Sequence, residues 1–241
     1  MKVYILSNNG IPANHNFYDA YAGFHEMGFE TILFETKDSL STALKEDVVV
    51  GYINTIRYQL KRFNIPIIDI DYPPQLNKYL GRKIWKSTIN EVNSNISLWP
   101  VFVKPIEDKR FTGRLIKSIR DLIGCGEYGY NAEVYCSEPI NLLAEWRCYV
   151  RYNKIIDIKR YRGTYKNIPN YALIEQAVSE YTTAPSGYSI DFGLTEDNRT
   201  LLIEVNDGYA LGNYGINSID YAKLLSARWH ELTNTIDECN F

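Results

Sequence analysis

The sequence contains few of the residues on which several common kinds of chemistry depend. It has three histidines, so catalysis built on histidine is not favoured. Its four cysteines, Cys125, Cys136, Cys148 and Cys239, form no CxxC pair and no spacing typical of zinc ligands. We therefore predict reduced, buried thiols in a cytoplasmic protein and expect no disulfide framework.

Long apolar runs and a surplus of one charge are also absent from the sequence. No segment approaches the ~20 apolar residues of a membrane span, and the apolar run over residues 1–6 is too short for a signal peptide. The formal net charge of -3 provides no broad basic field for a nucleic acid, and no GxxxxGK(S/T) motif is present. We therefore expect neither a membrane nor a nucleic acid as a partner.

The overall composition is typical of a globular protein with a large core. The 241 residues are 45% apolar and 23% charged, enough for one large domain or a few lobes. Apolar strands alternate with helices over the first 75 residues, which predicts a small parallel sheet covered on both faces. The expected strands are residues 3–6, 31–34, 48–52 and 66–70, and the expected helices are residues 17–27 and 53–63.

The pair Pro73-Pro74 marks the expected end of this first unit. The rest of the chain is predicted to combine helices with mostly antiparallel strands. A helix that carries Lys83 and Lys86 is expected to follow the boundary. The predicted helices are residues 77–92, 114–123 and 219–232, and the predicted strands are residues 101–104, 132–136, 145–151 and 155–162.

A predicted β-hairpin in the last third of the sequence is the most informative segment. With a turn centred at residues 197–198, Ile190 lies opposite Val205 and Phe192 lies opposite Ile203. One face of the hairpin is therefore expected to be apolar and buried.

The other face of this hairpin collects acidic and amide side chains. Asp191 lies opposite Glu204, and Asn206 follows two residues along on the same side. Opposed carboxylates repel each other, so a cation is expected between them, and carboxylate and amide oxygens are suited to Mg²⁺. The pattern predicts a magnesium–nucleotide site. The alternative is a surface hairpin whose polar face is merely solvated.

Lys104 stands at the end of a predicted apolar strand, where an ammonium group needs an anionic partner or an open cleft. Phe111, Thr112 and Gly113 follow and are expected to open a helix. Backbone N–H groups at a helix start bind anions, although most such Thr-Gly pairs are only caps. Together these residues predict a cradle for a polyphosphate.

A second predicted hairpin brings several cations together. Its expected register places Arg147 across from Arg160 and Glu145 across from Arg162, on one face. Opposed arginines require a counterion such as a phosphate or a substrate carboxylate, which arginine binds with two hydrogen bonds. Lys159 falls on the other face in this register. The alternative is a solvated basic strand.

These segments, in this order, resemble the ATP-grasp superfamily. The matching elements are Val-Lys-Pro at 103–105, Phe-Thr-Gly at 111–113, Glu-Trp-Arg at 145–147, Asp191, and Glu-Val-Asn at 204–206. The Lys-Pro, Phe-Thr-Gly, Glu-x-Arg and Glu-Val-Asn-Asp-Gly elements look most like the R2K clade of that superfamily. One departure is that many members have a longer glycine-rich flap over the phosphates.

The resemblance covers about residues 76–232 and implies an α/β (α+β) fold of the ATP-grasp type. It implies an N-terminal parallel α/β lobe at residues 1–75, a central lobe at residues 76–138, and a mostly antiparallel C-terminal lobe at residues 139–241, with ATP between the last two.

The resemblance also implies roles for individual residues, including a choice between Lys83 and Lys86 that favours Lys83. The backbone around Tyr135 to Ser137 would pair with adenine, and Glu138 would reach the ribose. The implied nucleotide-binding residues are Lys83, Lys104, Thr112, Gly113, Tyr135, Cys136, Ser137, Glu138 and Lys159. The implied Mg²⁺ ligands are Asp191, Glu204 and Asn206, and the residues implied to hold phosphate or an acyl-phosphate are Arg147 and Arg160.

The family reaction implies that this chain is an ATP-dependent carboxylate–amine ligase that forms an amide through an acyl-phosphate. Its cofactors would be ATP and Mg²⁺, and its partner a small molecule or peptide with a carboxylate and an amine. The rival hypotheses are a small-molecule kinase and a nucleotide-binding protein without turnover. A homodimer is left open by the sequence.

Overall fold

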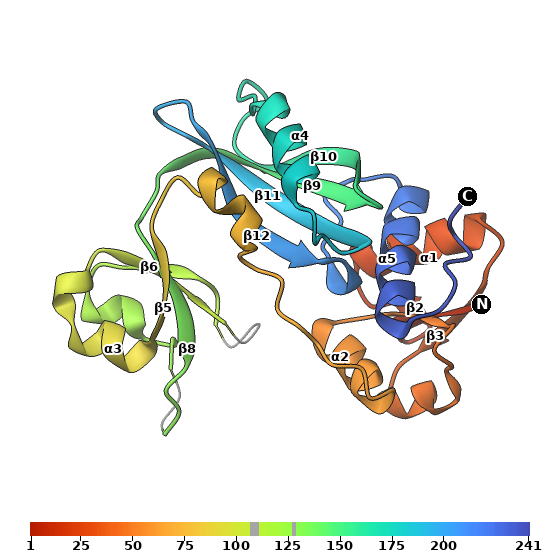
Figure 1. Ribbon diagram of the computed structural model, residues 1–241. Coiled ribbons are helices and arrows are strands. Elements are labelled where there is room, and N and C mark those ends of the chain that lie inside the picture. Colours follow the sequence, from red (N-terminus) through yellow and green to blue (C-terminus); the bar gives the residue numbers. More distant parts are fainter. Residues whose placement is uncertain (107–110, 127–128) are drawn as a thin grey trace. The chain divides into compact units, whose positions relative to one another are not determined.

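The structure is a computed structural model that describes residues 1–106, 111–126 and 129–241. The chain divides into two compact units, shown together in Figure 1. Unit 1 joins Met1–Tyr79 to Leu143–Phe241, and unit 2 is Leu80–Leu142. The first and last segments of the chain therefore fold together, while the division into three lobes at residues 75 and 138 remains a prediction.

The N-terminal part of unit 1 is a mixed four-stranded sheet around β1. β1 pairs in parallel with β3 and β4 and antiparallel with the short β2. Asn14 caps α1, because its side chain accepts hydrogen bonds from the backbone of Asn16 and Phe17. The elements are β1 (Lys2–Asn8), β2 (Ile11–Pro12), α1 (His15–Glu26), β3 (Glu30–Phe34), η1 (Lys37–Thr42), β4 (Val48–Val50), α2 (Ile53–Arg62) and η2 (Pro74–Tyr79).

The predicted fourth strand at residues 66–70 is wrong, because this segment is irregular. Pro66 lacks the N–H that a central strand must donate, and Ile68 is 72% exposed rather than buried. An apolar run alone cannot distinguish a buried strand from an extended surface segment.

The second sheet of unit 1 has the strand order β10-β9-β11-β12. The β9–β10 and β11–β12 pairs are antiparallel hairpins, as predicted. α4 contacts β10, while α5 contacts both β11 and α1 (Figure 1). The elements are β9 (Leu142–Arg151), β10 (Lys154–Arg162), α4 (Tyr171–Glu180), β11 (Gly187–Thr195), β12 (Thr200–Asp207), η5 (Gly208–Ala210) and α5 (Ser218–Thr233).

One hydrophobic core connects the two chain segments of unit 1. It contains Ile5 of β1 and Phe24 of α1 together with Tyr221 and Trp229 of α5, all nearly inaccessible to solvent. This core explains why α5 lies against α1 although about two hundred residues separate them in the sequence.

Unit 2 is an antiparallel sheet with the order β5-β8-β6-β7 and a short helix, α3. Val101, Val103, Val134 and Cys136 lie on one face of this sheet and form its core with Val92 of α3. The elements are β5 (Ile84–Thr88), α3 (Ile89–Ser94), η3 (Ile96–Leu98), β6 (Val101–Pro105), β7 (Arg114–Ile116), η4 (Ile119–Leu122) and β8 (Glu133–Ser137).

The predicted long helix at residues 77–92 is wrong, because strand β5 occupies its middle. Gly81 has a positive φ of 59° just before this strand. Trp85 packs against the core of unit 2, whereas its neighbour Lys86 is exposed, which is the alternation of a strand. Thr88 then caps α3, since its hydroxyl accepts from the backbone N–H of Glu91.

The predicted helix at residues 114–123 is also wrong. Arg114–Ile116 pairs with β6 as strand β7, and only a 3₁₀ turn, η4, follows. Ser118 and Asp121 form a capping box that starts this turn after the strand has ended. Phe111, Thr112 and Gly113 therefore precede a strand, and the helix N-terminus expected to bind phosphate does not exist there.

All four cysteines are unpaired and buried, as expected. Within residues 1–106, 111–126 and 129–241, none of the helices has the length and apolar character needed to cross a membrane.

Candidate functional site

The β11–β12 hairpin brings together the three side chains that the sequence singled out. Asp191 pairs with Glu204 across the ladder, and Asn206 lies in register with Ser189. The Asn206 amide nitrogen is 3.1 Å from Oε1 of Glu204 and 3.5 Å from Oδ2 of Asp191. The predicted polar face of the hairpin is therefore confirmed.

One detail of the predicted hairpin register is wrong. Ile190 pairs with Val205 as predicted, but Phe192 pairs with Leu202 rather than with Ile203. A β-bulge after Asp191 inserts one extra residue on β12. The residue pairs between the acidic group and the turn differ by one residue from the predicted register, whereas Asp191 and Glu204 pair as predicted.

A cation does lie against the two carboxylates, and it is a side chain of the protein. The guanidinium of Arg147 on β9 holds Asp191 with two hydrogen bonds, at 2.9 Å to Oδ1 and 2.7 Å to Oδ2. It also lies 4.0 Å from Oε1 of Glu204. Burial alone would lower the pKa of Arg147, but the charge and hydrogen bonds of Asp191 raise it above its usual value.

This ion pair is almost completely removed from solvent. The side chains of Arg147 and Asp191 are 9% and 1% exposed, and that of Glu204 is 26% exposed. The alternative of a merely solvated polar face is therefore wrong for Asp191. Breaking such a pair leaves a buried charge without its partner, which costs about 3–5 kcal/mol.

Two tyrosines complete the surroundings of Arg147. Its guanidinium carbon lies 4.9 Å from the ring centroid of Tyr214, which in turn stacks on Tyr161 at 4.8 Å. Tyr161 donates a hydrogen bond to Glu145, and burial together with the nearby charges of Asp191 and Glu145 raises the pKa of Tyr161. Tyr214 itself is 44% exposed.

The loop that carries Tyr214 is held in place from two sides. The buried hydroxyl of Tyr149 donates to the carbonyl of Gly212 and accepts from the backbone N–H of Tyr214. Asn213 donates its side-chain amide to Asp19, and its backbone N–H to the side chain of Asn16, both on α1. The glycine-rich segment that follows the acidic residues is therefore an anchored loop rather than a loosely attached connection.

The predicted pairing of Arg147 with Arg160 is wrong, because Arg147 pairs with Lys159. The turn lies at Tyr152 and Asn153, earlier than the expected register requires, and the first bulge in β10 corrects only part of this offset, so that Arg160 pairs with Trp146. Lys159 consequently projects on the face of Arg147, where it forms an ion pair with Asp157 at 2.7 Å. Arg160 projects on the opposite face, away from the acidic group.

The predicted pairing of Glu145 with Arg162 is confirmed, and the two side chains form an ion pair.

The chemistry of this donor set fits a divalent ion, provided that Arg147 gives up Asp191. Two carboxylates and one amide on adjacent strands suit Mg²⁺, which prefers oxygen ligands. Asn206 presents its amide nitrogen to the carboxylates in the present arrangement, and would have to rotate to offer its oxygen. Within the described part of the chain, no three histidine, cysteine or acidic side chains are grouped as metal ligands.

Unit 2 carries a second candidate group on the face of its sheet opposite the core. Lys86 on β5 and Lys104 on β6 both pair directly with Tyr135 on β8, so the three side chains project side by side. The ammonium of Lys86 lies 5.4 Å from the centre of the Tyr135 ring. This row offers two positive charges and an aromatic surface, which is an arrangement suited to a phosphate-bearing ligand.

Lys83, the lysine that the sequence favoured, lies before β5 and outside this row. Its ammonium is 5.5 Å from the centre of the Trp85 ring. Its backbone N–H donates to the carboxylate of Glu138, and its carbonyl accepts from the backbone N–H of Glu138. Lys83 and Glu138 therefore close the end of the β5–β8 ladder.

The backbone of Tyr135 to Ser137 cannot be the main partner of an adenine ring. β8 is a central strand, and these three residues pair with β5 on one side and β6 on the other. Their backbone donors and acceptors are thus committed to the ladders. The side chain of Cys136 points into the core, where burial raises its pKa to about 11.

Thr112 and Gly113 lie just before β7 rather than at a helix start. A Cβ atom at Gly113 would come within 2.8 Å of the Phe102 ring, so glycine allows close packing at this point. Residues 107–110, between Lys104 and this segment, lie outside the described residues.

Sequence reasoning missed the contributions of Tyr149, Tyr161 and Tyr214 to the surroundings of Arg147. Tyr214 stands between two glycines, which marked a loop but not a partner for an arginine. Tyr149 and Arg147 alternate along β9, and this period of two was the available signal for a shared face.

Comparisons with known proteins identify relatives of this chain. A family model described as "ATP-grasp domain, R2K clade family 2" matches residues 79–224, more than half of the chain. No curated protein matches the sequence.

Several solved structures share the fold at low sequence identity. The D-alanine–D-alanine ligase from Bacillus anthracis in complex with ATP has a TM-score of 0.60 and 14% identity, covering 97% of this chain and 96% of its own. The ATP-grasp ligase PsnB with a minimal precursor has a TM-score of 0.53 and 12% identity, covering 93% and 98%. The macrocyclase MdnC from Microcystis aeruginosa, bound to precursor peptide MdnA, has a TM-score of 0.51 and 14% identity, covering 93% and 99%.

Proposed function

Since the chain belongs to the ATP-grasp superfamily, R2K clade family 2, we propose that it is an ATP-dependent carboxylate–amine ligase. The observation that carries the proposal is the group of Asp191, Glu204 and Asn206 around the buried guanidinium of Arg147, on one face of the second sheet. This group combines a phosphate-binding guanidinium with oxygen ligands for a divalent ion.

The outer face of the unit 2 sheet would bind the nucleotide. Lys86 and Lys104 would bind phosphate oxygens of ATP, because both project from the same face of the unit 2 sheet. Glu138 would reach the ribose, and the backbone that follows the paired part of β8, at Pro139 and Ile140, would meet the adenine. ATP would lie near Lys83, Thr112 and Gly113. The side chain of Lys83 would form no hydrogen bond with it.

The acidic group would act on the reacting end of the nucleotide. Asp191, Glu204 and Asn206 would hold Mg²⁺, which supplies charge neutralisation at the phosphates. Arg147 would bind the transferred phosphoryl group and then the acyl-phosphate, with Lys159 on the same face adding positive charge. Arg160 has no part in this proposal because it projects from the other face.

The reaction proceeds in two displacements. An oxygen of the substrate carboxylate attacks the γ-phosphorus of ATP, which breaks the bond to the β-phosphate oxygen and releases ADP. An amine then attacks the acyl carbon, and phosphate leaves with one oxygen that came from the carboxylate. The site needs to stabilise negative charge more than to provide a strong base, which agrees with its content of cations and carboxylates.

The substrate would carry a carboxylate and an amine and would be an amino acid or a peptide. Structures of this fold have been solved with precursor peptides bound, namely PsnB with PsnA2 and MdnC with MdnA. The solved structure of a D-alanine–D-alanine ligase also shares this fold.

The proposal is tested by incubating the protein with ATP, Mg²⁺ and pools of amino acids or peptides. We expect ADP release that depends on the pool, accompanied by phosphate and by a product whose mass corresponds to loss of water between two substrates. ADP with a stable phosphorylated product would indicate a kinase instead. Tight ATP binding without ADP from any pool would indicate a nucleotide-binding protein without turnover.

A further inference from the structure

Arg147 occupies the position in which the sequence predicted a metal ion. Its guanidinium contacts both oxygens of Asp191 and approaches Glu204 to 4.0 Å. A divalent ion that used Asp191 would therefore have to displace a bidentate ion pair in a site with very little solvent.

Besides Asp191, the guanidinium of Arg147 contacts the ring of Tyr214. This ring lies 4.9 Å from the guanidinium carbon and is itself stacked on Tyr161. The backbone N–H of Tyr214 donates to the hydroxyl of the buried Tyr149, which anchors the backbone at Tyr214 to β9. Arginine stacked on an aromatic ring is stabilised by the electrostatic field of the ring.

We infer that Arg147 is a built-in counterion that competes with divalent ions for Asp191, and that Tyr214 is the positioning residue that keeps it there. The inference rests on the proposed role of Asp191, Glu204 and Asn206 as metal ligands. It follows that the protein binds a free divalent ion weakly, and that the ion binds well only after Arg147 has turned towards another anion, such as a phosphate of the nucleotide.

Titration of the nucleotide-free protein with Mn²⁺, followed by electron paramagnetic resonance, measures this competition directly. Arg147→Gln removes a positive charge next to the ligands, so we expect the affinity for Mn²⁺ to rise at least about tenfold. Tyr214→Ala only loosens the guanidinium, and an exposed cation–π contact of about 0.5–1 kcal/mol corresponds to a gain of about two- to fivefold.

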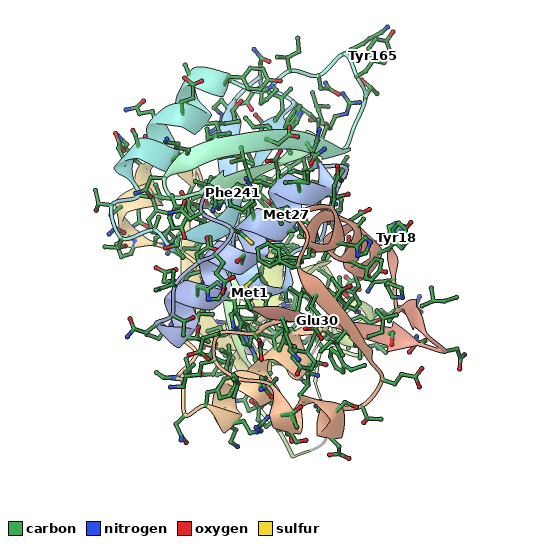
Figure 2. All side chains as sticks on the ribbon, turned by 90° about the vertical axis from the view of Figure 1, so that its right-hand side faces the viewer. Met1, Tyr18, Met27, Glu30, Tyr165 and Phe241 are labelled. Carbon is green, nitrogen blue, oxygen red and sulfur yellow. The ribbon has the colours of Figure 1, made fainter. Side chains whose placement is uncertain are left out.

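Two control variants separate the stacking contact from general effects. Tyr214→Phe keeps the ring and should leave the Mn²⁺ affinity unchanged. Tyr165→Ala removes a tyrosine that is 77% exposed and projects from the ribbon in Figure 2, and it should also change nothing. Circular dichroism shows whether each variant is folded, and Tyr214→Ala remains informative if Arg147→Gln fails to fold.

The inference is overturned if the wild-type protein binds free Mn²⁺ as tightly as Tyr214→Ala, with that variant folded. It is likewise overturned if folded Arg147→Gln gains no affinity. The amide-forming assay is a separate measurement: a wild type that makes the amide while neither variant gains Mn²⁺ affinity refutes only this inference. Variants that gain affinity while the wild type produces no amide refute the proposed ligase activity and leave the counterion role standing.

Discussion

The residues of the acidic group differ in how far they are buried, and this difference decides which of them can be changed safely. Asp191 is inaccessible and is held by Arg147, so any replacement also leaves a buried guanidinium without its partner. Glu204 is 26% exposed and lies farther from Arg147, which makes it the better residue for testing the proposed metal role.

Replacement of Glu204 by glutamine should remove most of the Mg²⁺-dependent turnover. The amide keeps the size of the side chain but loses the negative charge needed to hold the ion, and we expect kcat to fall by roughly a hundredfold or more. The thermal unfolding midpoint should stay close to that of the wild type. Glu196→Gln is the matched control, since Glu196 lies exposed in the turn of the same hairpin. Turnover near the wild-type level in Glu204→Gln would remove Glu204 from the site.

His230 is a buried residue outside the site that makes stability depend on pH. Burial lowers its pKa below the ordinary value of about 6.5, and its Nδ1 lies 2.6 Å from the hydroxyl of Thr235. The unfolded chain therefore takes up a proton that the folded chain does not. This contribution to stability is present above about pH 6.5 and is lost as the pH falls through the lowered pKa.

The prediction for His230 is measured by thermal unfolding at pH 7.5 and pH 5.5. The wild type should lose stability between these values, and His230→Asn, which cannot take up the proton, should lose less. An equal loss in both proteins would show that His230 makes no contribution in this range.

At the scale of elements, the sequence pattern predicted some residue pairs of the two hairpins correctly and others wrongly. Asp191 and Glu204 lie beyond the bulge when counted from the turn. They pair as predicted because the bulge offsets the difference between the expected turn and the observed one, which is centred on Asp197. Arg147 and Arg160 do not pair, because the turn lies at Tyr152 and Asn153 and the offset is removed only beyond the second bulge in β10, where Glu145 pairs with Arg162. The alternation of side chains predicts which residues of two strands lie opposite each other only where the pairing register is regular.

Strand β5 illustrates the other limit, which is the helix–strand ambiguity of short segments. Ile84–Thr88 has too few residues for the period of its apolar side chains to distinguish a strand from a helix. Because this segment is a strand and not a helix, Lys86 lies in the row with Lys104, and Lys83 does not.

The two lysines should therefore differ in their effect on nucleotide binding. Loss of a charge-assisted hydrogen bond typically costs about 1.5–3 kcal/mol, so Lys86→Ala should weaken binding of ATP about tenfold or more by calorimetry. Lys83→Ala should weaken it less than about twofold, because its side chain lies against Trp85. The opposite order of the two affinities would contradict the assignment made from β5.

The junction between β12 and η5 depends on the absence of a side chain at Gly208. A Cβ atom there would lie 2.2 Å from the carbonyl oxygen of Gly187, a backbone atom that cannot rotate away. We expect Gly208→Ala to lower the free energy of unfolding by about 3 kcal/mol or more in urea titrations.

Gly212→Ala is the matched control for this prediction. Its nearest neighbour would be a nitrogen of Arg147 at 3.6 Å, an ordinary contact, so the free energy of unfolding should change by less than about 1 kcal/mol. Equal effects of the two substitutions would show that the close approach at Gly208 is not what limits stability.

At the scale of the whole molecule, the organisation arises from contacts between distant parts of the chain. The pair Pro73-Pro74 predicted a boundary, yet the residues before it share a core with α5 at the other end of the sequence. Such long-range contacts leave no local trace, since each segment is apolar with or without the other. The order of the short motifs carried the fold class, because five elements in sequence constrain a whole topology where single elements do not.

As a whole, this molecule is proposed to activate a carboxylate by transferring the γ-phosphoryl group of ATP to it. Once a substrate pool has given an amide, the acid is prepared with ¹⁸O in its carboxylate, and the inorganic phosphate released is analysed by mass spectrometry. We predict one ¹⁸O atom in the phosphate for each amide formed. Phosphate without ¹⁸O, released while the amide accumulates, would contradict an acyl-phosphate route.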